Sequence, residues 1–136
     1  MSLDFQFDHL AFNTSADGDL QAALQTLLGV EPGPRPAFPF PGHWLYQGGQ
    51  ALVHLIEGEH TRFNHLALRT AHPASAVLER VRASGLPYQV AVLPQERVCQ
   101  VFVSLPGGLV LELDCPLDRD DIGISHHYQH STHAPV

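Results

Sequence analysis

The chain of 136 residues contains no lysine, and its seven basic residues, all arginine, stand against fourteen Asp or Glu. Because the formal net charge is −7, we expect neither nucleic acid nor an anionic membrane surface as a partner. No apolar run approaches the roughly twenty residues that span a bilayer, and the segment MSLDFQFDHL lacks the basic-then-apolar pattern of a signal peptide. These absences predict a protein without a membrane segment.

Cysteine is also scarce, whereas histidine is abundant. Cys99 and Cys115 are too few for a disulfide framework, so we expect a cytoplasmic protein in which Cys99 is a small buried hydrophobe. An apolar content of 44% with 15% charged residues is typical of a folded globular protein, and the length suits one domain. The ten histidines carry the commonest metal-ligating side chain, so their placement decides the interpretation.

An internal repeat organises the chain. The segment FDHLAF at 7–12 returns as FNHLAL at 63–68, which separates His9 from His65 by 56 positions. LLGV at 27–30 matches ASGL at 83–86 with the same separation. LVHLI at 52–56 matches VLELD at 110–114, which places His54 opposite Glu112. Four polar side chains therefore occupy equivalent places in two halves of the chain.

Each half predicts a strand, a helix and three further strands. Apolar residues alternate through 3–12 and 62–70, as in half-buried strands. Leucines at helical spacing predict a helix before Gly29 with Ser15 or Asp17 as N-cap, and a second helix opens at Pro73 and stops at Gly85. The further strands are expected at about 35–40, 43–47, 51–57, 88–93, 97–104 and 109–115. Because RPAFPFPG holds three prolines, 35–40 must be an edge strand or a loop.

Strand parity decides which side chains can converge. It places His9 and His65 on the faces opposite the Leu and Phe side chains that can receive the helices. The residues expected to share these two faces are Phe5, Phe7, Ala11, Phe63, Ala67 and Arg69. Glu112 lies between leucines, where a buried carboxylate is costly unless a cation or hydrogen bonds satisfy it. A single strand histidine is more often structural, and Glu112 alone could pair with Arg69 or Arg97, but four repeat-equivalent groups favour a shared site.

On DHLAF with His9, NHLAL with His65 and PGGLVLELD with Glu112, residues 4–115 resemble the vicinal oxygen chelate superfamily. It includes glyoxalase I, extradiol dioxygenases, methylmalonyl-CoA epimerase and the fosfomycin and bleomycin resistance proteins. The resemblance implies an α+β fold of two tandem βαβββ modules, about 3–58 and 61–115, whose cupped, mostly antiparallel sheet surrounds a metal. Residues 1–115 would form one glyoxalase-like domain, followed by a His-rich tail at 116–136.

The resemblance also implies a metal site. His9, His65 and Glu112 would be ligands, and His54, which stands where glyoxalase-like members have Glu or Gln, would be a fourth ligand or a nearby group. Imidazoles with one carboxylate suit Zn²⁺, Ni²⁺, Mn²⁺ or Fe²⁺ and do not suit Ca²⁺. Glu112 is then the only ligand carboxylate available as a catalytic base.

Three classes of function stay open. The first is a metal-dependent lyase or isomerase that acts on a small substrate with vicinal oxygens through an enolate-like intermediate. The second is an Fe²⁺ extradiol-type ring-cleaving dioxygenase, and the third is a non-enzymatic dimeric protein that binds a drug or metabolite. His54 disfavours a glyoxalase in the strict sense, and the absence of lysine disfavours the fosfomycin branch, since no lysine can contact a phosphonate. A homodimer is expected on the resemblance alone.

Weaker candidates lie outside these motifs. Trp44 and Tyr46 are expected to wall a substrate or to serve as core aromatics, and Arg69 to hold a substrate anion or a salt bridge. The tail carries His126, His127, His130 and His133. A helical turn would bring His126 and His130 together as a metal pair, whereas a flexible tail is the simpler expectation.

Overall fold

The computed structural model describes residues 3–119, 122 and 126–127, whose strands form one sheet in the order β2-β3-β4-β1-β5-β8-β7-β6-β9. The first half contains β1 (Gln6–Thr14), α1 (Asp19–Leu28), β2 (Glu31–Gly33), β3 (Gly42–Gln47) and β4 (Gln50–Glu57). The second contains β5 (Arg62–Arg69), α2 (Ala74–Ser84), β6 (Tyr88–Leu93), β7 (Val98–Leu105) and β8 (Leu109–Pro116), with β9 (His126–His127) after it. In the described part, no helix has the length and apolar character needed to cross a membrane.

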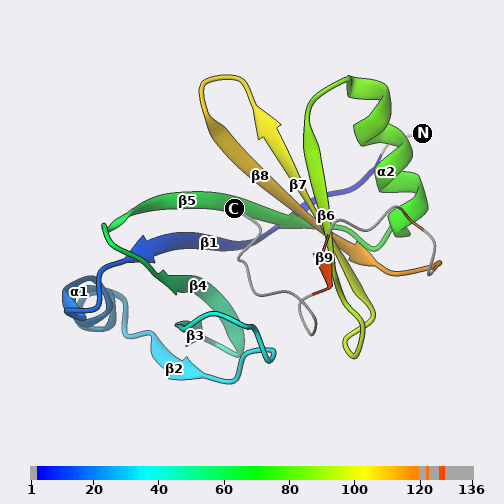
Figure 1. Cartoon of the computed structure of the whole chain (residues 1–136). Coiled ribbons are helices and arrows are strands. Elements are labelled where there is room, and N and C mark those ends of the chain that lie inside the picture. Colours follow the sequence, from blue (N-terminus) through cyan, green and yellow to red (C-terminus); the bar gives the residue numbers. More distant parts are fainter. Residues whose placement is uncertain (1–2, 120–121, 123–125, 128–136) are drawn as a thin grey trace.

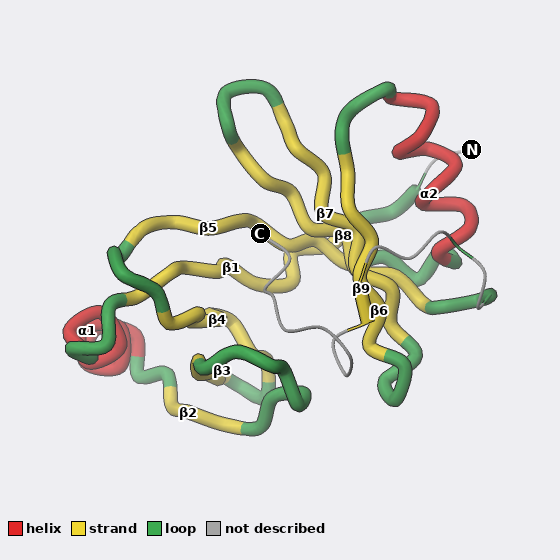
Figure 2. Tube along the Cα trace, viewed as in Figure 1, coloured by secondary structure: helices red, strands yellow, loops and turns green. Residues whose placement is uncertain are grey.

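The two halves share one topology and meet at the antiparallel pair of β1 and β5. In the first half β1 runs parallel to β4, and β3 and β2 follow β4 toward one edge of the sheet. In the second half β5 runs parallel to β8, and β7 and β6 follow β8 toward the other edge. Figures 1 and 2 show the strands curving, with α1 beside the first half and α2 beside the second. The predicted α+β fold of two βαβββ modules is confirmed.

The two helices contribute unequally to the core. α2 buries Ala74, Val77, Leu78 and Val81 in the larger apolar cluster, which also contains the fully buried Cys99. No residue of α1 is fully buried; its Leu20 and Leu24 pack on the smaller cluster of Val30, Leu45, Val53 and Leu55. The side chain of Leu27, expected on the apolar face of α1, is 79% exposed. The second half therefore holds most of the core.

Because the two helices are buried to different extents, truncating one leucine in each should change the free energy of unfolding by very different amounts. Leu78→Ala should lower the free energy of unfolding by about 2–5 kcal/mol, because Leu78 is 1% exposed and its loss leaves a cavity under α2. Leu27→Ala is the matched control and should change it by less than about 0.5 kcal/mol. Urea titration followed by far-UV circular dichroism measures both. Equal losses for the two variants would contradict the described packing of the helices.

The proline-rich segment at 35–40 is a loop, which is one of the two expected alternatives, and does not form the edge strand. The strand that follows α1 is β2 at Glu31–Gly33, and no strand forms at 35–40, because prolines remove the backbone donors that a ladder needs. Phe38 and Phe40 of this loop pack on Ala91, Leu93 and Phe102 of the second half. The loop thus crosses from one module to the other.

Smaller expectations are also corrected. The N-cap of α1 is Gly18, with φ 79°, and is neither Ser15 nor Asp17, although the Asp17 carboxylate accepts a hydrogen bond from the Asp19 amide at 3.0 Å. α2 has Pro73 as its N-cap and ends at Gly85 as predicted.

Expectations about side-chain placement fail as well. A register shift between Phe7 and His9 turns Phe7 and Phe5 away from the face of His9, and Phe5 packs on the cluster under α2. A second shift pairs Phe63 with Phe12, so Phe63 lies on the face opposite His65. At the other end of the chain, His126–His127 form β9 beside β6 and are therefore not helical. His130, the other member of the helical pair considered above, and His133 lie outside the described residues.

Candidate metal centre

The central strands bring His9, His65 and Glu112 together over two small residues. Ala67 of β5 is paired with His9 of β1 on one side and with Glu112 of β8 on the other. Ala11 of β1 is paired with His65 of β5. Directly paired residues project to the same face of a sheet, and both alanines are fully buried. The larger polar groups can therefore converge over the methyl groups.

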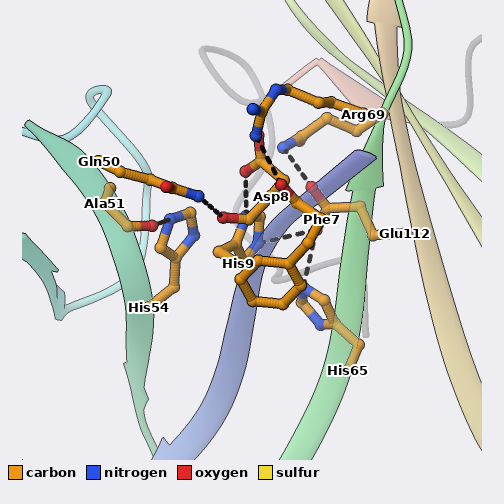
Figure 3. Close-up of polar contacts among 10 residues, drawn as sticks. Phe7, Asp8, His9, Gln50, Ala51, His54, His65, Arg69 and Glu112 are labelled. Carbon is orange, nitrogen blue, oxygen red and sulfur yellow. Dashed lines mark hydrogen bonds and ion pairs between the residues drawn. The ribbon is translucent and has the colours of Figure 1, made fainter. Parts of the chain in front are cut away.

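The ligand atoms of these three residues meet at one point. The Nε2 atom of His65 lies 2.7 Å from Oε1 of Glu112, and Nε2 of His9 lies 3.6 Å from the same oxygen. All three side chains are buried, and their possible ligand atoms lie within 4.8 Å of one another. Figure 3 shows the three side chains pointing toward one another. A second such group, Asp8, His9 and Asp114, adjoins the first and shares His9.

Hydrogen bonds at the far side of each ring fix its orientation. The Nδ1 atom of His9 lies 2.6 Å from Oδ1 of Asp8, and Nδ1 of His65 lies 2.6 Å from Oδ1 of Asn64. Because an amide or carboxylate oxygen only accepts, each Nδ1 donates, and a neutral ring then has its lone pair on Nε2. This is the arrangement in which outer hydrogen bonds orient metal-ligating histidines.

The site fits a divalent transition metal on its own geometry. The Nε2 atoms of His9 and His65 are buried and have no hydrogen-bond partner among the described residues. A lone pair on Nε2 of His65 faces a carboxylate oxygen at 2.7 Å, which is repulsive unless a cation lies between them. Two imidazole nitrogens and one carboxylate are the donors that Zn²⁺, Mn²⁺ and Fe²⁺ accept.

Charges in the centre are strongly coupled. Burial opposes a charge on His9, but the contact with Asp8 and the negative charges of Asp8 and Glu112 outweigh it and raise the pKa of His9 to about 9. Burial also opposes a charge on Glu112, yet the adjacent Asp114, His65 and His9 hold the pKa of Glu112 well below its usual range. Burial and the adjacent Glu112 charge raise the pKa of Asp114 well above its usual range. These opposite shifts favour the negative charge on Glu112 and the proton on Asp114.

His54 lies beside this group but does not join it. Its ring stacks on His9 with 3.5 Å between centroids, and its Nε2 donates to the backbone oxygen of Ala51 at 3.1 Å. Burial and the positive charge of His9 lower the pKa of His54 to about 2, so the ring is neutral. The repeat places His54 opposite Glu112 in sequence, and the register preserves this, since Ala11 is paired with His54 as Ala67 is with Glu112.

A cavity of about 580 Å³ opens next to His9 and His54 and draws on both modules. Its aromatic wall includes Trp44 and Tyr46, and Arg69 lies at its rim. The Tyr46 hydroxyl donates to the backbone oxygen of Pro34, while Arg69 donates to the backbone oxygen of Phe7 at 2.6 Å and lies 3.5 Å from Asp8. The remaining lining residues are Asp8, Pro36, Gly49, Gln50, Ala51, Thr70, Leu93, Glu96, Val98, Gln100, Asp114, Cys115 and Pro116.

Four residues of the centre were missed by the sequence analysis. Asp8 and Asn64 had a usable signal, because each directly precedes a repeated histidine, in DHLAF and NHLAL. Gln100 of β7 donates to Oε2 of Glu112 at 3.2 Å, and Asp114 lies two residues from Glu112 on the same strand. Nothing in the sequence marks Gln100, since its role depends on the pairing of β7 with β8.

Comparisons with known proteins agree with this architecture. No family model matches the sequence, and no curated protein matches it. Among solved structures, the Mn(II)-bound glyoxalase of Novosphingobium aromaticivorans is 21% identical, with a TM-score of 0.66 over 88% of this chain and 43% of that one. Methylmalonyl-CoA epimerase of Mycobacterium tuberculosis is 18% identical, with a TM-score of 0.57 over 81% and 87%.

A third similar structure is homoprotocatechuate 2,3-dioxygenase of Brevibacterium fuscum in complex with 3,4-dihydroxyphenylacetate. It is 12% identical, with a TM-score of 0.65 over 85% of this chain and 38% of that one. The chain thus spans less than half of the glyoxalase and dioxygenase chains. All three proteins are members of the vicinal oxygen chelate superfamily, and this chain has their fold.

Proposed function

We propose that the protein is a divalent-metal-dependent enzyme that acts on a small substrate with two adjacent oxygens. His9, His65 and Glu112 are the proposed ligands, and the metal is one of Zn²⁺, Ni²⁺, Mn²⁺ or Fe²⁺. One observation carries the proposal: two buried Nε2 atoms, each oriented by a hydrogen bond at Nδ1, face one buried carboxylate oxygen. The fold, shared with a Mn(II)-bound glyoxalase, supports it.

The first candidate reaction is a lyase or isomerase reaction through an enolate-like intermediate. The metal would supply a Lewis acid that stabilises negative charge on adjacent substrate oxygens. Glu112 is the base that moves the proton: Gln100 holds its Oε2, and its Oε1 faces the histidines. The cavity beside His9, which Trp44 lines, would hold the substrate next to the proposed metal.

A second candidate, an Fe²⁺ ring-cleaving dioxygenase, is favoured by the number of ligands. The stacked His54 leaves two histidines and one carboxylate, which is the donor set of non-haem Fe²⁺ oxygenases with open positions. The fold likeness to a dioxygenase in complex with a catechol-type compound, 3,4-dihydroxyphenylacetate, supports the same reading.

Two assays separate these candidates. Protein loaded anaerobically with Fe²⁺ and given a panel of catechols should consume O₂ if it is a dioxygenase. A lyase or isomerase loaded with Mn²⁺, Zn²⁺ or Ni²⁺ should instead exchange the C–H hydrogen next to a substrate carbonyl in D₂O, which proton NMR follows. A binding or drug-resistance protein should do neither, and ligands should raise its melting temperature even after EDTA treatment. Wild-type protein that binds none of the four metals would contradict the proposal.

A homodimer and a cytoplasmic location belong to the same proposal. Phe63 and Leu109, which are 45% and 55% exposed, line one surface pocket, and exposed large apolar side chains are enriched where subunits meet. The two buried thiols suit a reducing compartment. Light scattering coupled to gel filtration should give twice the chain mass.

A further inference from the structure

We propose that His54 positions the ligand His9 by ring stacking, with Trp44 as its backing, and is not itself a ligand. The inference rests on the proposed metal site and concerns how that site is held. His54 and Glu112 occupy equivalent positions in the repeat, and the proposal gives them different roles.

Three rings form a continuous column. His54 stacks on His9 with 3.5 Å between centroids and 14° between planes. Trp44 stacks on the other face of His54 with 3.9 Å between centroids and again 14° between planes. Phe38 of the proline-rich loop packs against Trp44, with 6.0 Å between the ring centroids. The column therefore runs from the loop that crosses between the modules to a ligand of the proposed metal.

The geometry of the stack prevents His54 from sharing an ion with His9. The lone pair of an imidazole nitrogen lies in the plane of its ring, and a metal binds in that plane at about 2.0–2.1 Å. Two rings that bind one ion must therefore have planes that meet at the ion. The planes of His9 and His54 differ by only 14° and the ring centroids lie 3.5 Å apart, so the planes do not meet within bonding distance.

The stack supplies a constraint that the hydrogen bond of His9 lacks. The Nδ1 contact to Asp8 at 2.6 Å fixes one end of the ring, yet it leaves the ring free to tilt about that contact. His54 covers one face of the ring and blocks the tilt. His54 is itself fixed, because its Nε2 donates to Ala51 and Trp44 covers its other face. A ligand held in this way loses little conformational freedom when the metal binds.

Four variants test the assignment: His54→Phe, His54→Ala, Trp44→Ala and the control His43→Phe, at an exposed histidine of β3. Phenylalanine keeps a flat ring but has no lone pair. The dissociation constant for Zn²⁺ is measured by competition with a chromophoric chelator, and the visible absorption bands of the Co²⁺ form report coordination number. Circular dichroism of each variant confirms folding.

The expected pattern is specific. His54→Phe and His43→Phe should leave the Zn²⁺ dissociation constant within about threefold of wild type, less than 1 kcal/mol, with unchanged Co²⁺ bands. His54→Ala and Trp44→Ala should raise it by about 10–100-fold, the usual cost of losing a group that orients a ligand.

If His54→Phe weakens binding as much as His54→Ala and shifts the Co²⁺ bands, His54 is a ligand. If His54→Ala and Trp44→Ala bind like wild type, the stack positions nothing. Failure of the proposed function would instead appear as no Zn²⁺ or Co²⁺ binding by wild-type protein.

Discussion

Replacing His65 with Ala is expected to leave the purified protein without stoichiometric metal. Only three described residues place ligand atoms at the proposed centre, so the variant would retain two. Loss of a group that merely orients a ligand costs about 10–100-fold in metal affinity, and loss of a ligand should exceed about 100-fold. Elemental analysis of freshly purified protein and chelator competition measure the effect.

The control for this variant is His60→Ala, at an exposed histidine in the loop before β5. It should keep the wild-type metal content. Because His65 is 4% exposed, its truncation opens a cavity, so His65→Gln provides a second variant that nearly keeps the volume. Wild-type metal content in folded His65→Ala or His65→Gln protein would show that His65 is not a ligand.

The repeat was sufficient to predict the order of elements and much of the strand register. Two residue offsets placed His9 with His65 and His54 with Glu112, and the sheet pairs Ala11 with His54 as it pairs Ala67 with Glu112. This worked because both halves bury equivalent apolar faces under a helix, and a one-residue slip in a strand would expose that face.

Local departures from regular strand geometry were harder to predict. One register shift before His9 and another before His65 each insert one residue into the ladder, and they move Phe5 and Phe63 to the faces opposite those that parity gives. The strand after α1 lies at 31–33 because the prolines that follow cannot donate to a ladder. The same prolines keep the next segment out of the sheet, and its Phe38 packs on the second module. Neither displacement changes the hydrophobic pattern on which the prediction rested.

The same limit applies to the centre. Sequence equivalence indicated that His54 belongs with the other three residues, but not whether its ring points at them or stacks beside them. That choice depends on Trp44, which reaches His54 only through the pairing of β3 with β4. Gln100 escaped prediction for a similar reason, because it contacts Glu112 across two strands. Repeats predict which positions meet, whereas the rotamers there depend on neighbours from other strands.

Glu112→Gln is expected to produce the second large effect, on both metal binding and turnover. Glu112 is 2% exposed and lies within 3.6 Å of both histidine Nε2 atoms. Among the described residues it is the one carboxylate grouped with both histidines, so it would neutralise part of the charge of an ion at that point. Glutamine has nearly the same shape but no charge. Removing one partner of a buried charge pair costs about 3–5 kcal/mol, which corresponds to a dissociation constant for Zn²⁺ at least about 100-fold higher.

Turnover should fall further than metal binding explains. At saturating metal, loss of the proposed base should lower kcat by about 10²–10⁴-fold, the usual contribution of a positioned general base. Glu96→Gln is the matched control, because Glu96 lines the neighbouring cavity but is exposed and contributes to neither ligand group. It should leave metal affinity unchanged. A Glu112→Gln variant that binds Zn²⁺ as Glu96→Gln does would remove Glu112 from the centre. One that loses affinity but keeps kcat at saturating metal would leave it a ligand and assign the proton transfer elsewhere, with Asp114 the nearest remaining carboxyl group on β8.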